Sequence, residues 1–216
     1  MRKYKKYKGI LLTAVTCLAV LGAHGCASSV KTEKTDGSSS FEGAFIISAK
    51  EAEGKIGDPD VLFVDARGTD LAEKGTVEGA VVTDWQSLST CQEGTAGDEG
   101  WGLVPEPEDL TKRLQQLGIE KDKEIIVLGQ PEDGWGEDGR VLWELREAGC
   151  EDLKIVDGGI TAMKDIGVDT TAEPAEPKVS DIVVEELDES HDIKTEELQE
   201  NYEDYKLLDV RTPKEY

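Results

Sequence analysis

Residues 124–159 constrain the fold of this chain more than any other stretch. An apolar run at residues 125–128 predicts a buried strand, and a second short run at residues 153–156 predicts another. Between them, before a stop at Gly149, apolar side chains recur at the spacing of one face of a helix: Val141, Leu142, Leu145 and Ala148. The order strand, helix, strand indicates a βαβ unit, whose two strands lie parallel in one sheet.

The loop between the first strand and the helix, residues 129–139, is where we expect any functional groups. Ligands of open parallel sheets bind outside the carboxyl ends of the strands, and this loop directly follows such an end. The loop is rich in glycine and carries four acids: Glu132, Asp133, Glu137 and Asp138. Its contents therefore decide which chemistry the chain can support.

Other segments extend the same pattern. Ser48 and Glu51 have the spacing of a capping box that opens a short helix, and residues 61–64 predict another strand. A further amphipathic helix is expected to begin at Pro107. We therefore expect an α/β fold for residues 43–167, with a short parallel sheet and helices on both of its faces.

The charge balance excludes several classes of function. The chain has 47 Asp and Glu against 24 Lys and Arg, a formal net charge of -23 at pH 7. Such a surface repels nucleic acid and anionic lipid headgroups, so neither is an expected partner. The two histidines, His24 and His191, are too few for a multi-histidine metal site, and a Ser-His-Asp triad is nearly excluded. We expect no metal and no cofactor.

The amino terminus has the features of an export signal. Basic residues precede an apolar run at residues 10–22, which is too short to span a bilayer at about 20 residues. The small residues that follow lead to Cys26 and resemble a bacterial lipobox. We expect residues 1–25 to be a signal peptide, Cys26 to be lipidated and residues 26–42 to be a flexible tether. The protein would then be exported and anchored on the outer side of the cytoplasmic membrane, in the periplasm or at the cell surface.

The end of the chain repeats its beginning. Two segments recur about 145 residues further on, in the same order: residues 47–52 as 193–198, and residues 63–67 as 207–211. We expect residues 168–180 to be a linker with little capacity to pack and residues 181–216 to begin a second copy of the domain. That copy reaches only about its first strand at Tyr216, so we expect the chain to be a fragment of a longer product.

At this point the residues resemble the rhodanese family of sulfurtransferases in its tandem two-domain form. LLDVRTPKEY at residues 207–216 is similar to the family's strand-Asp-x-Arg-x-x-x-Glu-Tyr segment. GTVEGA at residues 75–80 resembles Gly-His-Ile-Pro-Gly-Ala, with the His and Pro replaced. Residues 151–160 resemble the family's strand that ends in Asp-Gly-Gly.

The resemblance implies a specific chemistry. In the family, a cysteine just after the central strand takes sulfane sulfur from a donor such as thiosulfate and passes it to a thiophilic acceptor such as cyanide or a thiol. In this chain Gly129 occupies that position, so the first copy has no nucleophile. We expect the parent protein to be a sulfurtransferase whose cysteine lies beyond Tyr216, and the chain itself to be inactive. The alternative is a surface-anchored rhodanese-like module that only binds.

The resemblance also assigns roles to two Asp-x-Arg segments. Arg211 matches an arginine that binds the anionic donor in the catalytic copy of tandem rhodaneses, and a guanidinium suits such an oxyanion. Arg67 would be its counterpart in the first copy. Asp65 and Asp209 are expected to hold loops rather than to react.

The remaining cysteines, Cys91 and Cys150, have no basic neighbour in sequence that would lower a thiol pKa. We expect them to be structural or inert, and the sequence leaves open whether they pair.

Three other interpretations are weaker. Gly134, Gly136 and Gly139 form G-x-G-x-x-G before a helix, with Asp157 further on, as in dinucleotide-binding folds. However, these glycines begin well past the end of the strand, and acids surround the place of a pyrophosphate. A Cys-x5-Arg phosphatase loop is excluded by Gly129, and the acidic loops lack the alternating ladder of an EF-hand.

Overall fold

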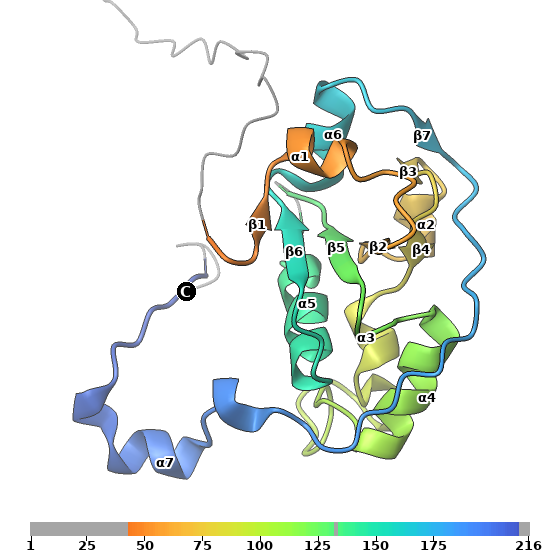
Figure 1. Ribbon diagram of the computed structural model, residues 1–216. Coiled ribbons are helices and arrows are strands. Elements are labelled where there is room, and N and C mark those ends of the chain that lie inside the picture. The colour runs from red at the N-terminus through yellow and green to blue at the C-terminus, as the bar shows by residue number, and fades with distance from the viewer. Residues whose placement is uncertain (1–42, 132–133, 212–216) are drawn as a thin grey trace, which may run out of the picture. The chain divides into compact units, whose positions relative to one another are not determined.

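The computed structural model describes residues 43–131 and 134–211 (Figure 1). They all belong to one of the chain's two units, Glu33–Tyr216. The expected signal peptide, the expected tether and Cys26 lie outside the described residues, as do Glu132, Asp133 and the end of the LLDVRTPKEY segment. Among the described residues, no helix has the length and apolarity needed to cross a membrane.

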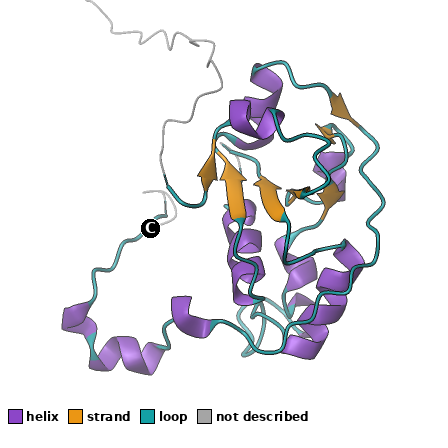
Figure 2. Cartoon of the chain, viewed as in Figure 1, coloured by secondary structure: helices purple, strands orange, loops and turns teal. Residues whose placement is uncertain are grey.

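A five-stranded sheet forms the centre of the domain (Figures 1 and 2). Its strands are ordered β1 (Ile46–Ile47), β6 (Leu153–Val156), β5 (Glu124–Leu128), β2 (Val61–Asp65) and β4 (Val81–Val82). Every neighbouring pair is parallel. The α/β fold expected from the sequence is therefore confirmed, although the short edge strand β1 had no signal of its own.

Helices cover both faces of this sheet. In chain order the helices of the described residues are α1 (Ala49–Glu53), α2 (Thr69–Ala72), α3 (Trp85–Leu88), α4 (Pro107–Leu117), α5 (Glu137–Glu147), α6 (Gly159–Asp165) and α7 (Thr195–Glu200). The last of these, α7, buries no residue and does not cover the sheet (Figure 1). Short 3-10 turns lie at Cys91–Glu93, Glu189–His191 and Tyr202–Asp204.

The alternating side chains of β5 show how the two layers form. Ile125 and Val127 pack into one hydrophobic cluster with the apolar faces of α4 and α5. Ile126 and Leu128 pack into a second cluster with α1 and α6 on the other face. A central strand buried on both sides has a continuous apolar run in its sequence, which is why residues 125–128 were recognisable as a strand.

The helix ends also follow local rules. Ser48 and Glu51 form the expected capping box at α1, with each side chain bonded to the other's backbone N–H. Pro107 is the first residue of α4, and Gly118 ends that helix in a left-handed conformation with φ 78°.

Residues 168–180, expected to be a linker with little capacity to pack, contain no buried residue, but their backbone is attached to the domain. β7 (Thr170–Thr171) pairs antiparallel with β3 (Thr76–Val77) in a small second sheet. The chain then runs beside α4, where a side chain at Gly118 would lie 2.8 Å from the carbonyl oxygen of Lys178. Ala175 N donates to the carbonyl oxygen of Ala80, so the backbone of this segment is tied to the domain.

Two of the residues that follow this segment pack into the core. Ile182 and Val184 are 5% and 4% exposed and belong to the cluster under α4 and α5. Val184 N donates to Thr111 Oγ1 at 2.9 Å, and Gln115 Nε2 donates to the carbonyl oxygen of Ile182. Residues spaced two apart on an extended chain face the same side, which lets both enter the core. Where the second domain begins stays a prediction.

The two recurring segments, from which a second copy was expected, differ in structure. α7 lies where the repeat of residues 47–52 predicts a helix. The strand expected at residues 207–210 is absent, and Leu207, Leu208 and Val210 are exposed. A strand is stable only when neighbouring strands take its backbone hydrogen bonds, and the described residues offer this segment none.

Candidate functional site

The loop after β5 begins at a closely packed glycine. Gly129 is buried, and its carbonyl oxygen accepts a hydrogen bond from Ile160 N at 3.1 Å. Gly159 has φ 52° and approaches so closely that an added Cβ would collide with the Gly129 carbonyl oxygen. The Asp-Gly-Gly segment after β6 therefore packs directly against the backbone of this loop.

Asp138 occupies the space beside Gly129. A side chain added at Gly129 would collide with the Asp138 carboxylate. Asp138 lies in the first turn of α5, and its Oδ1 accepts from Gly139 N at 2.8 Å. Burial raises the pKa of Asp138 above its usual range. The sequence shows four acids in this loop, but only the structure shows that Asp138 fills the position next to the end of β5.

The Asp-x-Arg segment after β2 is a buried ion pair. Arg67 Nη2 lies 2.6 Å from Asp65 Oδ2, and the side chains are 4% and 0% exposed. Arg67 Nε and the Arg67 backbone N both donate to Asp65 Oδ1, and Arg67 Nη2 also donates to the carbonyl oxygen of Gly75. The pair thus ties the end of β2 to the segment that leads into β3.

The second Asp-x-Arg segment has the same pair in the open. Arg211 Nη2 lies 2.6 Å from Asp209 Oδ2, with the side chains 56% and 41% exposed. Hydrogen bonds from Arg211 lower the pKa of Asp209. Nothing in this geometry tests donor binding by Arg211, which stays a prediction.

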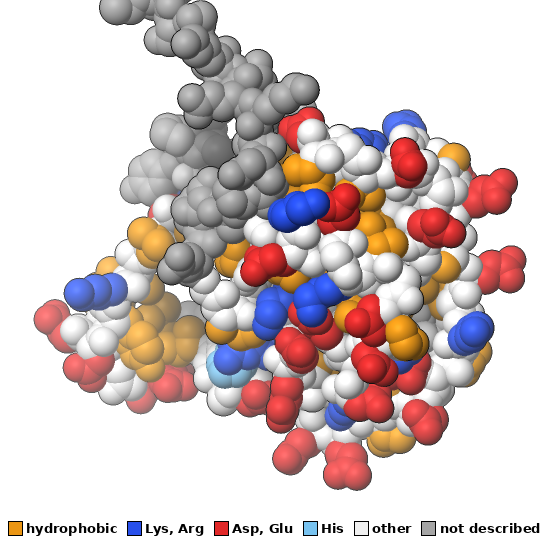
Figure 3. Space-filling model, turned by 45° about the horizontal axis from the view of Figure 1, so that its top comes forward, with side chains coloured by type: hydrophobic (Ala, Val, Ile, Leu, Met, Phe, Trp, Pro, Cys, Tyr) orange, Lys and Arg blue, Asp and Glu red, His pale blue; other side chains and the backbone are white. Residues whose placement is uncertain are grey.

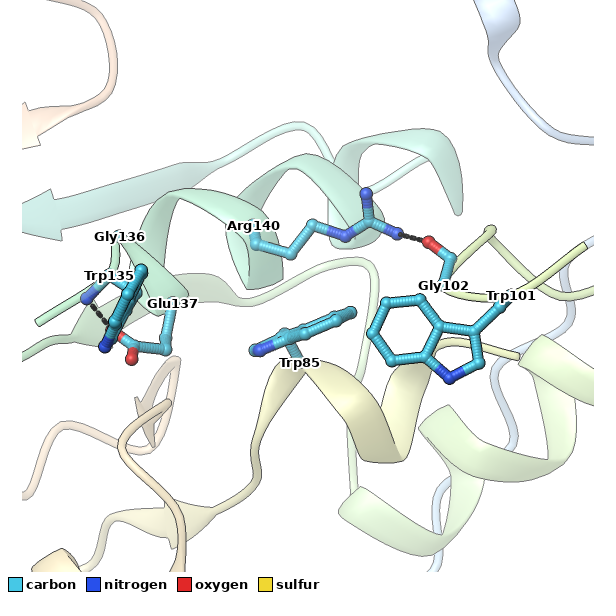
Figure 4. A pocket seen from close by; sticks show the side chains of 7 residues that line it. All are labelled: Trp85, Trp101, Gly102, Trp135, Gly136, Glu137 and Arg140. Carbon is cyan, nitrogen blue, oxygen red and sulfur yellow. Dashed lines mark hydrogen bonds between the residues drawn. The ribbon is translucent and has the colours of Figure 1, made fainter. Parts of the chain in front are cut away.

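A pocket lined by three tryptophans lies next to the loop that follows β5 (Figure 4). We call it the tryptophan pocket; its volume is about 340 Å³, and its lining residues are Trp85, Trp101, Gly102, Trp135, Gly136, Glu137 and Arg140. The tryptophans come from α3, from the long loop before α4 and from the loop before α5. No sequence spacing links these three segments, so only the fold brings the rings together.

Arg140 joins the walls of the tryptophan pocket. Its guanidinium carbon lies 5.8 Å from the ring centre of Trp85 and 4.5 Å from that of Trp143. Its Nη2 donates to the carbonyl oxygen of Gly102 at 2.8 Å. Trp85 and Trp101 meet edge to face, with ring centres 5.7 Å apart.

A buried carboxylate lies behind Arg140. Glu144 is fully buried, and its Oε1 accepts from Arg140 Nε at 3.0 Å and from Ser89 Oγ. Its Oε2 has no hydrogen-bond partner among the described residues. Burial raises the pKa of Glu144 to about 6, and the bonds from Ser89 and Arg140 counteract part of that rise.

The two described cysteines are both free thiols. Burial raises the pKa of Cys150 to about 11, and burial together with the charge of Glu144 raises that of Cys91. Both are therefore poor nucleophiles at neutral pH. Within residues 43–131 and 134–211, no group of three or more His, Cys, Asp or Glu side chains could hold a metal ion.

Comparison with known proteins identifies the family. The family model for the rhodanese-like domain matches residues 48–165, more than half of the chain. A putative thiosulfate sulfurtransferase of Mycolicibacterium smegmatis is 25% identical over 172 residues, which cover 79% of this chain and 59% of that protein. The 3-mercaptopyruvate sulfurtransferase of Escherichia coli is 28% identical over 115 residues, or 49% of this chain and 38% of the relative.

Solved structures agree on the fold. SseA from Escherichia coli superposes with a TM-score of 0.58 at 22% identity, over 68% of this chain and 57% of that one. Tum1 from Saccharomyces cerevisiae superposes with a TM-score of 0.60 at 15% identity, over 76% of this chain and 57% of that one. The chain thus spans less than two thirds of these proteins. With its parallel sheet, Asp-Gly-Gly turn and family match, this chain belongs to the family of rhodanese-like domains.

Proposed function

We propose that this chain is part of a sulfurtransferase-family protein and that its described domain supports the reaction without performing it. The reaction would move sulfane sulfur from a small anionic donor of the thiosulfate type to cyanide or a thiol. The two relatives above are named as sulfurtransferases, which supports the reaction class. The observation that carries the supporting role is Gly129, whose side-chain space Asp138 fills.

The chemistry explains why this position matters. A thiolate attacks the outer sulfur of thiosulfate, a sulfur–sulfur bond forms on the protein, and sulfite leaves. The acceptor then takes that sulfur, cyanide becoming thiocyanate, and the thiolate returns. Gly129 offers no thiol, and the Asp138 carboxylate beside it would repel both a thiolate and the anionic donor. The nucleophile would have to come from a part of the protein other than residues 43–167, and Arg211 would help to bind the donor.

A second candidate function is a binding module without catalysis. The open tryptophan pocket next to the loop after β5 supports this function, because exposed apolar patches on a protein surface often mark binding sites.

For either function we propose an exported protein that is anchored in the membrane through a lipid on Cys26. We expect the wild-type protein to incorporate labelled palmitate and Cys26→Ser to incorporate none. A wild-type protein that takes up no label would refute the lipid anchor.

The direct test of the reaction uses the full 216-residue chain. We expect no thiocyanate from thiosulfate and cyanide, with an active rhodanese as positive control. Turnover that Cys91→Ser or Cys150→Ser abolishes would overturn the proposal, since it would place the nucleophile within this domain.

The role of Asp138 can be tested by building the missing thiol. Gly129→Cys should give a thiol of low reactivity, because the carboxylate takes its space and raises its pKa. Gly129→Cys combined with Asp138→Ala should react with iodoacetamide roughly tenfold faster or more at pH 7. Labelling of the introduced thiol is followed by mass spectrometry of the peptide that contains it. Equal rates in the two variants would show that Asp138 does not close the site.

A further inference from the structure

We propose that the tryptophan pocket binds a small organic cation with apolar substituents, such as a quaternary ammonium group. The inference goes beyond the proposed function, since it needs no sulfur transfer and no residue outside the described domain. It rests on the ring geometry of the pocket, on the carboxylate that lines it and on the pairing of its one arginine.

The aromatic walls are the first argument. In Figure 4, Trp135 and Trp101 stand at opposite ends of the pocket with Trp85 between them. Trp135 is 85% exposed, and Trp85 and Trp101 are partly exposed. Indole rings left in water cost hydrophobic free energy, and their electron-rich faces attract cations more strongly than those of Tyr or Phe. A pocket of about 340 Å³ has room for a small organic ligand.

The charge of the pocket is the second argument. Arg140 is paired with the fully buried Glu144 at 3.0 Å and is held by Gly102 and Ser89, so its charge is compensated. Glu137 lines the pocket between Trp135 and Trp85, and its carboxylate accepts from Trp135 N at 2.9 Å. Among the described residues it forms no ion pair. Glu137, Arg140 and Glu144 together therefore carry one net negative charge, and many acidic side chains lie on the face of the molecule seen in Figure 3.

These two features select among ligand classes. An anion such as thiosulfate would meet Glu137 and the negative faces of the rings, and both repel it. An inorganic cation would lose its hydration shell for a single carboxylate and gain little in return. A cation whose charge is spread over methyl groups is weakly hydrated, so it can stack on the indole rings and face Glu137 together.

The test compares two ligands of nearly the same shape and different charge. Choline is titrated into the full chain, followed by tryptophan fluorescence and calorimetry, and 3,3-dimethylbutan-1-ol serves as its neutral isostere. We expect choline to bind saturably and about tenfold tighter than the alcohol, as cation–π contacts and one carboxylate would give. Equal affinities would show a merely apolar pocket, and absence of choline binding or displacement of choline by thiosulfate would overturn the proposal.

Variants locate the binding. Trp135→Leu and Glu137→Gln should each weaken choline binding by about tenfold, while Trp135→Phe should retain part of it. Trp135 is so exposed that its replacement leaves the fold intact. Glu176→Gln removes the same charge from an exposed site elsewhere and should leave affinity unchanged. Loss of binding in Glu176→Gln equal to that in Glu137→Gln would mean that only net charge attracts the cation.

Discussion

Two Asp-x-Arg segments of this chain have the same local geometry and opposite surroundings. In both, the arginine Nη2 lies 2.6 Å from the aspartate Oδ2, two residues back along the chain. Asp65 and Arg67 are almost completely buried, whereas Asp209 and Arg211 are about half exposed. The comparison separates what a short sequence does by itself from what its surroundings add. The segment forms the pair in either place, but only the fold can make the pair indispensable.

The largest difference between the two pairs is expected when the buried arginine is removed. Arg67→Met should destabilise the domain by about 3–5 kcal/mol, because it leaves the Asp65 carboxylate buried without its partner. It also removes the hydrogen bond to Gly75 that holds the segment before β3. Urea unfolding followed by fluorescence measures the change. A loss below about 1 kcal/mol would mean that water replaces the guanidinium at this site.

A second test extends the comparison to apolar side chains. Ile182→Ala should cost about 2–4 kcal/mol, because Ile182 fills the cluster under α4 and α5. Leu208→Ala, at an exposed residue of the repeated segment, should change the free energy of unfolding by no more than about 0.5 kcal/mol. Equal effects of the two substitutions would mean that residues 181–184 do not belong to the core.

A third test uses the pH dependence of the buried Glu144. Its pKa is raised to about 6, so the folded state holds this proton more tightly than the unfolded state. The stabilisation is complete below the ordinary glutamate pKa and is lost as the pH rises through about 6. Between pH 4 and pH 7, the free energy of unfolding of the wild-type protein should therefore fall by on the order of 2 kcal/mol relative to that of Glu144→Gln.

Unfolding measured across that range gives the difference directly. Glu176→Gln, at an exposed residue, serves as the control for the loss of one carboxylate from the chain. A flat difference for Glu144→Gln would mean that Arg140 and Ser89 keep the Glu144 pKa near its usual value.

The smallest effect is expected at the exposed pair. Arg211→Met should leave the free energy of unfolding nearly unchanged, since an exposed ion pair gains little over hydration. The same substitution made at Arg67 is its matched comparison. A loss at Arg211 as large as at Arg67 would show that the second segment is buried in the protein in solution.

Local signals in the sequence predicted much of the fold. The apolar runs indicated β2, β5 and β6, the capping box indicated α1, and Pro107 indicated the start of α4. These features depend on neighbours within a few residues, so they can be recognised in one sequence. Residues 168–180 were expected to be a linker with little capacity to pack, and none of them is buried; no local signal indicated that Ala175 and Ser180 would donate backbone hydrogen bonds to distant residues.

The candidate site was predicted only in part. The absence of a thiol at Gly129 is a property of one residue and could be read directly. That Asp138, among four neighbouring acids, fills the space beside Gly129 depends on how α5 meets the sheet. The tryptophan pocket depends on three segments that no sequence pattern connects.

The sequence by itself determined the parallel α/β layers, the Asp-x-Arg pairs and the absence of a thiol at position 129, because each follows from residues close together in the chain. The tertiary structure alone decided which ion pair is buried, which carboxylate closes the loop after β5 and which indole rings share a pocket. Burial and long-range contact are set by how the layers pack, and they convert the same local geometry into a structural tie at Arg67 and an exposed group at Arg211.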